Sequence, residues 1–227
     1  MLTLLHTSPV HVPVFDALRD REHPGLEMRH VVHEELLALA RSGGPGAADA
    51  ATAAVLAEVV GEGGATAVLC TCSSIGAAAE AYAARLGVPV LRVDRPMAAA
   101  AVAAAPERDT VRIAVVATVD STFGPTCDLI REEAERAGRP ADIRTVLAEG
   151  AWKHFEDGDQ DGYLDVVARV VDTIIGVDVV VLAQSSMADA AARVVRSHIA
   201  VPVLSSPAPG LRAAAAAVPL IPVSPGP

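Results

Sequence analysis

The sequence predicts an α/β protein of two pseudo-symmetric lobes, each with a parallel sheet flanked by helices, and an active-site cleft between the lobes. Two observations lead to this prediction. Short runs rich in Val, Leu and Ile alternate with longer Ala-rich helical stretches, which is the pattern of βαβ units. The segment from Thr66 to Leu91 also aligns with the segment from Val179 to Leu204, at a spacing of 113 residues. A repeat of this length indicates a duplicated domain rather than a solenoid.

The first half of the chain contains four candidate strands, each a short apolar run. The run from Leu2 to His6 ends at a Thr-Ser-Pro loop, and the run that begins at Val88 reads Val-Pro-Val-Leu. The intervening stretches have the length and the apolar spacing of helices. Strands are expected at 2–6, 26–32, 66–69 and 88–91, and helices at 12–21, 34–41, 49–60 and 74–86.

The second half repeats this order. The run Val177 to Leu182 is nearly continuous Val, which is typical of a parallel strand buried on both faces. Strands are expected at 112–117, 143–147, 177–182 and 201–204, and helices at 126–137, 163–175 and 187–196. The Ala-rich segment 209–217 has no counterpart inside the second half. We therefore expect it to pack back onto the first lobe, so that 1–95 and 206–227 form one lobe and 96–205 the other.

Composition excludes several classes of protein. Among 227 residues, 52% are hydrophobic and the formal net charge is −10, which argues against a disordered chain, a nucleic-acid binder and a membrane-surface binder. The only lysine is Lys153, so no Schiff-base lysine exists elsewhere. The opening residues lack the basic and apolar regions of a signal peptide, and no apolar stretch reaches the 20 or so residues of a membrane span. We expect a cytoplasmic protein.

The candidate site lies in the loops that follow the strands, because the carboxyl ends of parallel strands meet at one edge of a sheet. These loops read HTSPVHV, CTCSS, VATVDST and AQSSM, and they carry small hydroxyl or thiol side chains. Each precedes a helix, whose free N–H groups can bind an anion. Substrate binding is therefore assigned to Thr7, Ser8, Thr71, Cys72, Thr118, Ser185 and Ser186. The alternative for each hydroxyl is ordinary helix capping.

Cys70 is the first candidate for chemistry. It directly follows a strand and precedes a helix, and a thiol at a helix N-terminus has a lowered pKa, which suits a base or a nucleophile. Two alternatives stay open: Cys70 packs as a small loop residue, or Cys72, two residues later, is the reactive thiol.

Three motifs resemble the aspartate/glutamate racemase superfamily, which includes hydantoin racemase, maleate isomerase and arylmalonate decarboxylase. They are LCTCSS, AQSSM and VPVLSSPAPGLRAA, and the resemblance covers nearly the whole chain. It places Cys70 on the first catalytic cysteine of the family, Thr71 on a hydroxyl residue and Cys72 on an Asn. The family pattern places Gln184 on the second catalytic cysteine, whereas the ungapped internal repeat places Ala183 opposite Cys70.

Neither alignment supplies a second thiol. A cofactor-independent racemase needs a base on each face of the α-carbon, and a glutamine does not exchange protons near neutral pH. The resemblance therefore implies chemistry with one thiol, without cofactor or metal, on a small carboxylate-bearing substrate, of the isomerase or decarboxylase type, in a homodimer. Two alternatives remain: a racemase whose second base is Ser185 or a histidine, and a non-catalytic protein that binds small acids.

Overall fold

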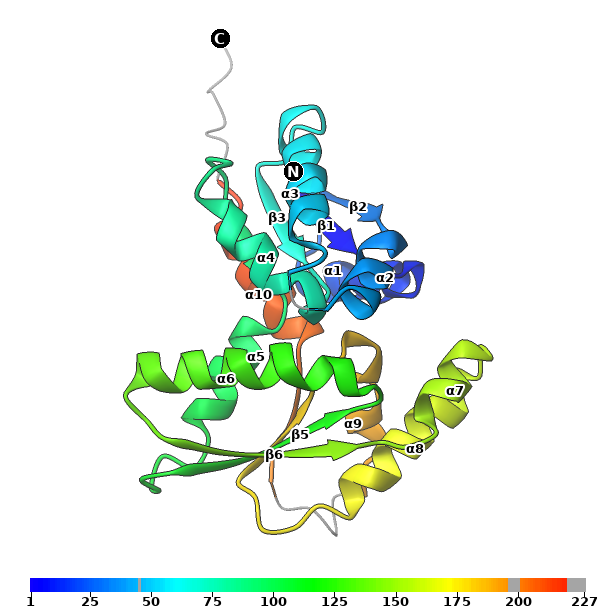
Figure 1. Ribbon diagram of the computed structural model, residues 1–227, viewed down its shortest axis with the longest axis vertical. Helices are drawn as coiled ribbons and strands as arrows, with labels where there is room; N and C mark the ends of the chain where they lie inside the picture. Colours follow the sequence, from blue (N-terminus) through cyan, green and yellow to red (C-terminus); the bar gives the residue numbers. More distant parts are fainter. Residues whose placement is uncertain (45, 196–200, 220–227) are drawn as a thin grey trace.

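The computed structural model describes residues 1–44, 46–195 and 201–219. They form two lobes, one above the other in Figure 1, and each lobe holds one four-stranded sheet. Every strand pairing in both sheets is parallel. The predicted α/β fold of two lobes is therefore confirmed. Within the described ranges, no helix is both long and apolar enough to cross a membrane.

The upper lobe contains the first sheet, in the strand order β2-β1-β3-β4. Its strands are β1 (Leu2–His6), β2 (Met28–Val32), β3 (Ala67–Cys70) and β4 (Val90–Arg92). Its connections hold a 3₁₀ turn, η1 (Pro9–His11), and the helices α1 (Val12–Glu22), α2 (Glu34–Ser42), α3 (Asp49–Gly61) and α4 (Ser73–Ala83).

The lower lobe contains the second sheet, in the equivalent order β6-β5-β7-β8. Its strands are β5 (Val111–Ala117), β6 (Ala141–Leu147), β7 (Val179–Leu182) and β8 (Val203–Ser205). Its helices are α5 (Arg95–Ala103), α6 (Phe123–Ala137), α7 (Ala151–Glu156), α8 (Gln160–Asp172) and α9 (Ala190–Arg193), with 3₁₀ turns η2 (Asp120–Thr122) and η3 (Ser185–Met187).

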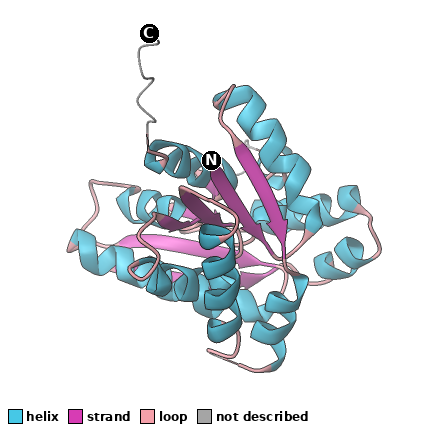
Figure 2. Cartoon of the chain, turned by 90° about the horizontal axis from the view of Figure 1, so that it is seen from above, coloured by secondary structure: helices cyan, strands magenta, loops and turns pink. Residues whose placement is uncertain are grey.

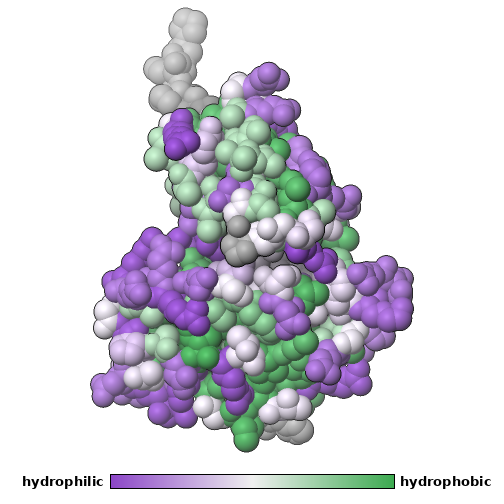
Figure 3. Space-filling model, viewed as in Figure 1, coloured by the Kyte–Doolittle hydropathy of each residue, from purple (hydrophilic) through white to green (hydrophobic). Residues whose placement is uncertain are grey.

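Helices cover both faces of each sheet (Figure 2), which explains why the central strands are apolar without alternation. In β5, Ile113 and Val115 pack in the core beside α5 and α6, whereas Ala114 and Val116 pack in the core beside α8. Helix α6 is amphipathic. Hydrophilic side chains gather over α6 on the face drawn in Figure 3, and its other side is buried in the core.

The structure differs from the sequence prediction at three helices. Helices α5 and α7 were not predicted, and the helix expected at 187–196 is the turn η3 followed by the short α9. Helix α5 begins with a proline in its first turn and buries Met97, Ala98 and Ala101. Its long alanine run lacks the polar face on which an amphipathic pattern depends. Residue 196 lies outside the described residues.

The last helix, α10 (Pro207–Ala217), returns to the upper lobe. Leu211 and Ala214 are buried in one cluster with Leu2, Leu4 and Phe15. The lobe boundaries given above stay predictions, and the part of the predicted return segment from residue 220 onward lies outside the described residues.

Gly210 is expected to be required for this return. A Cβ atom at Gly210 would lie 2.5 Å from the Val93 carbonyl oxygen and 2.9 Å from the Val93 Cα, so Gly210→Ala forces two backbones apart. We expect a loss of about 1–3 kcal/mol in the free energy of unfolding, measured in urea. Gly124→Ala is the matched control, because a Cβ there meets no atom within 4 Å. Equal stability of the two variants would contradict the packing of α10.

Candidate active site

A pocket of about 350 Å³ lies between the lobes, at the carboxyl ends of strands from both sheets. Its volume is in the range of small-molecule sites. Seven of the nine residues predicted for the site line this pocket, and they come from three strand-to-helix turns: Thr7, Ser8, Thr71, Cys72, Gln184, Ser185 and Ser186. The pocket lining does not include Cys70 or Thr118. The topology therefore brings together loops that lie more than 170 residues apart in the sequence.

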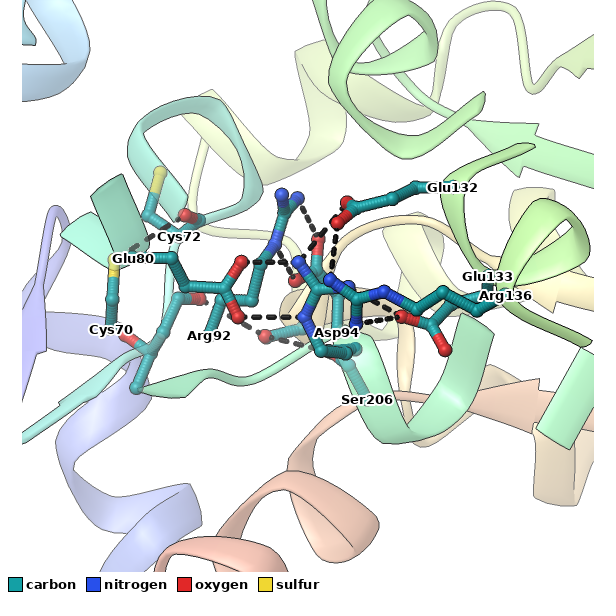
Figure 4. Close-up of polar contacts among 12 residues, drawn as sticks. Cys70, Cys72, Glu80, Arg92, Asp94, Glu132, Glu133, Arg136 and Ser206 are labelled. Atoms are coloured by element: carbon teal, nitrogen blue, oxygen red, sulfur yellow. Dashed lines mark hydrogen bonds and ion pairs between the residues drawn. The ribbon is translucent and has the colours of Figure 1, made fainter. Parts of the chain in front are cut away.

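Cys70 lies in the core of the upper lobe and is fully buried. Its Sγ donates a hydrogen bond to the backbone carbonyl oxygen of Cys72 at 3.5 Å (Figure 4). Burial raises the pKa of the Cys70 thiol well above its usual range, the reverse of the lowered pKa expected from the sequence. The reason is that Cys70 is the last residue of β3, and its side chain is buried together with the rest of that strand. At neutral pH, Cys70 is thus a neutral thiol that holds the following turn.

Cys72, in contrast, is partly exposed and lines the pocket. It has an extended backbone, with φ −113° and ψ 121°, and occupies the N-cap position of α4. The next residue, Ser73, is the first of the helix, and the first N–H groups of a helix have no partner within it. A sulfur and a set of free N–H donors therefore meet on the same side of the pocket.

The strand registers identify the equivalent residues of the two lobes. Leu5 pairs with Cys70 in the first sheet, and Val116 pairs with Leu182 in the second. The next N–H group continues each ladder: Thr71 donates to Leu5 at 3.0 Å, and Ala183 donates to Val116 at 2.9 Å. The residue equivalent to Ala183 is thus Thr71. The ungapped repeat aligns Ala183 with Cys70 instead.

One residue later, Cys72 corresponds to Gln184. Gln184 is likewise an extended N-cap residue, with φ −118° and ψ 138°, before the first turn of η3. The spacing between these two residues is 112, one less than the repeat spacing of 113. If Gln184 stands where the second thiol of a two-thiol site would be, the position equivalent to it in the upper lobe is Cys72.

The side chain of Gln184 is held by Thr118, which is buried and does not line the pocket. The backbone N–H and the hydroxyl of Thr118 both donate to Gln184 Oε1, at 2.7 and 2.8 Å. The amide group is thereby fixed with its oxygen turned toward Thr118. Gln184 offers the pocket hydrogen-bonding groups but no titratable group.

The chain matches the Asp/Glu/hydantoin racemase family over residues 13–214. It belongs to this family. No curated protein matches the chain by sequence. The fold is similar to that of solved structures of low sequence identity, among them two racemases and a decarboxylase.

Glutamate racemase isoform RacE1 from Bacillus anthracis shares 14% identity at a TM-score of 0.65, over 94% of this chain and 79% of that one. A point mutant of arylmalonate decarboxylase shares 19% identity at a TM-score of 0.61, over 96% and 92%. Allantoin racemase from Pseudomonas fluorescens shares 17% identity at a TM-score of 0.57, over 95% and 89%. At these identities the likeness concerns the fold.

In this racemase-family chain, a histidine network supports the turn that carries Cys72. The Thr71 hydroxyl donates to the Leu5 carbonyl oxygen at 3.1 Å, so it accepts from His6 Nδ1 at 2.8 Å. His6 Nε2 then accepts from His30 Nδ1 at 2.8 Å, and His30 Nε2 lies 3.3 Å from an Asp16 oxygen. Burial lowers the pKa of His6 to about 3, so it stays neutral and keeps this donor pattern.

A buried ion pair supports the opposite side of Cys70 (Figure 4). Arg92, the last residue of β4, binds Asp94 through two hydrogen bonds, of 2.7 and 2.9 Å, and both side chains are almost fully buried. Arg95, three residues after Arg92, binds Glu80 of α4 in the upper lobe and Glu132 of α6 in the lower lobe. Arg95 therefore links the two lobes behind the pocket.

One wall of the pocket was not predicted from the sequence. It is built by α2 and α7, and it consists of Glu34, Leu37, Ala38, Arg41, Trp152 and Phe155. Helix α7 was not predicted, and the pocket-facing side of α2 carries no motif. His11 also lines the pocket from η1, and burial lowers its pKa to about 4. The signal that could have found this wall is the spacing of Trp152 and Phe155, which places both rings on one side of a helix.

Iodoacetamide at mildly alkaline pH is expected to modify Cys72 before Cys70 and Cys127. Cys72 lines the pocket, whereas the other two thiols are buried and their pKa values are raised by burial. Peptide mapping by mass spectrometry gives the order, and a carboxylate ligand should protect Cys72. The unfolded protein, in which all three thiols should react, is the control. Labelling of Cys70 first in the folded protein would contradict this assignment.

Proposed function

We propose that this chain is a cofactor-independent enzyme that uses a single thiol, that of Cys72, on a small carboxylate-bearing substrate. The reaction is of the isomerase or decarboxylase type. The observation that carries the proposal is the pairing of Cys72 with Gln184: the two strand-to-helix turns face one pocket, and only one of them presents a titratable side chain. Cys70 keeps a positioning role through its hydrogen bond to Cys72.

The hydroxyl and N–H groups of the four turns suit a carboxylate and the enediolate that forms when a proton or a carboxyl group leaves the neighbouring carbon. In a decarboxylation, the C–C bond to the leaving carboxylate breaks and its electron pair remains in the enediolate. Cys72 then donates its proton to that carbon and regains one from solvent. In an isomerisation, the Cys72 thiolate adds to a double bond, rotation follows, and the thiolate leaves again.

The racemase alternative needs a second base on the Gln184 side. His11 lines the pocket, but it lies on η1 and so belongs to the upper lobe, the same lobe that carries Cys72. Ser185 is buried and donates to the Thr71 carbonyl oxygen at 3.3 Å, so its hydroxyl proton is already engaged. Both observations favour chemistry with one thiol. The homodimer and the cytoplasmic location stay predictions, and the former is testable by size-exclusion chromatography with light scattering.

Cys72→Ser is expected to lower turnover in assays of carboxylate isomerisation and decarboxylation by about 10²–10⁴-fold or more, because the proton-transferring group is lost. Cys127→Ala is the matched control and should retain activity, since Cys127 lies on the buried side of α6, in the core of the lower lobe. Turnover that survives in Cys72→Ser would overturn the proposal. If the unmodified protein and both variants bind the ligand equally well and none of the three shows turnover, a non-catalytic acid-binding protein is favoured.

Gln184→Cys is expected to introduce racemisation. The unmodified chain should racemise aspartate, glutamate and hydantoins slower than a two-thiol site by orders of magnitude, because one face of the α-carbon lacks a base. The substitution places a second thiol at the position equivalent to Cys72. Loss of optical rotation and deuterium uptake from solvent at Cα provide the readout, and Gln184→Ser controls for the loss of the amide. Rapid racemisation by the unmodified protein would contradict this account.

A further inference from the structure

The pocket has two unlike walls. The strand-to-helix turns contribute hydroxyl groups, N–H groups and the Cys72 thiol, whereas α2 and α7 contribute a mostly apolar wall. On α2, the pocket-lining residues are Glu34, Leu37, Ala38 and Arg41, a spacing that places all four on one side of the helix. The opposite side of α2 buries Leu36 in the core of the upper lobe. The pocket-facing side of α2 therefore does not pack in the core.

Among the described residues that line this pocket, Arg41 is the only Arg or Lys. Its guanidinium carbon lies 5.3 Å from the centre of the Trp152 ring, so a cation of the upper lobe rests on an aromatic ring of the lower lobe. In the part of the chain that the structure describes, no carboxylate lies within 4.0 Å of Arg41 to form an ion pair. Stacking on a ring leaves the N–H edge of a guanidinium able to bind an anion in two-point fashion.

We propose that Arg41 is the specificity-determining residue of this pocket and binds a second anionic group of the substrate. The substrate class is then an elongated dianion. Its reacting carboxylate lies among the strand-to-helix turns, its apolar middle lies against Leu37, Ala38 and Trp152, and its far anionic group binds Arg41. This inference rests on the proposed function only in taking the pocket as the substrate site.

The charge pattern along α2 gives the substrate a direction. Glu34 lies in the first turn and Arg41 in the last, seven residues apart, which is about 10 Å along a helix axis. A negative group is repelled at the first turn and attracted at the last. The apolar side chains between them, with Trp152 and Phe155 stacked at a ring-centre distance of 4.8 Å, offer no partner for a charge. A flat or aliphatic linker fits this stretch.

Trp152 supplies a direct readout, because it is the only tryptophan of the chain and lines the pocket. We suggest titrating its fluorescence with two probes of nearly equal shape, 4-carboxyphenylacetate and 4-methylphenylacetate. They share the acetate group and the ring and differ in the far anion. The unmodified protein is expected to bind the dianion about tenfold more tightly, the gain of a charge-assisted hydrogen-bonded pair.

Arg41→Gln should abolish this preference: the dianion loses about tenfold in affinity, while the methyl probe changes less than twofold. Arg41→Lys should keep part of the preference, since the charge remains and the forked geometry does not. Arg85→Gln is the matched control, because Arg85 lies 5.5 Å above the Tyr82 ring in the same kind of contact outside the pocket. It should leave both affinities unchanged.

Three results would overturn the proposal: an unchanged preference in Arg41→Gln, an equal loss for both probes, or no binding of either probe at millimolar concentration. An equal loss of affinity for both probes would indicate that Arg41 stabilises the contact between the lobes and does not bind an anion. Cys72→Ser separates this proposal from the proposed function. It should keep the preference for the dianion whether or not the thiol carries the chemistry, because the readout is binding alone.

Discussion

The contact on which the site depends joins the two strand-to-helix turns at the centre of the molecule. The Ser185 hydroxyl of the lower lobe donates to the carbonyl oxygen of Thr71 in the upper lobe at 3.3 Å, and it also lies 3.2 Å from the hydroxyl of Ser206. All three residues are buried. A buried carbonyl requires a partner, because an unpaired polar group costs about 1–3 kcal/mol. The hydrogen bond between Ser185 and Thr71 therefore keeps the turns of Cys72 and Gln184 next to the same pocket.

Thr71 concentrates the constraints of the upper lobe. Its N–H continues the β1–β3 ladder, its hydroxyl is fixed between Leu5 and His6, and its carbonyl accepts from the lower lobe. The residues before and after it thereby acquire different surroundings. Cys70 remains in the strand and shares its buried packing surface, whereas Cys72 begins the turn into α4 and faces the pocket. Two thiols only two residues apart thus differ in whether they can meet a ligand.

The pseudo-symmetry of the lobes is conserved in the backbone and broken in the side chains. Thr7 and Thr118 are equivalent, since each follows the last residue of its central strand, and both are buried. In the lower lobe that threonine holds an amide, and in the upper lobe the equivalent partner position carries a thiol. An asymmetric pair on a symmetric frame favours a reaction that needs a proton on one face of the substrate. The wall of α2 and α7 adds a second asymmetry. The two helices follow equivalent strands, β2 and β6, but α2 lines the pocket with Glu34, Leu37, Ala38 and Arg41, whereas α7 lines it with Trp152 and Phe155.

The sequence by itself determined the fold class, because apolar runs and Ala-rich helices alternate and the segment of Val88 to Leu91 recurs at Val201 to Leu204. It also determined which loops form the pocket, since parallel strands present their carboxyl ends together. Only the tertiary structure distinguished Cys70 from Cys72. Both stand in one loop of the sequence, and the difference arises from where the β3 ladder ends and from the packing that buries the last strand residue. The contributions of helix α7 and Arg41 to the site could not be predicted from the sequence for the same physical reason. Their place in the site depends on a contact between the lobes, which no local sequence pattern shows.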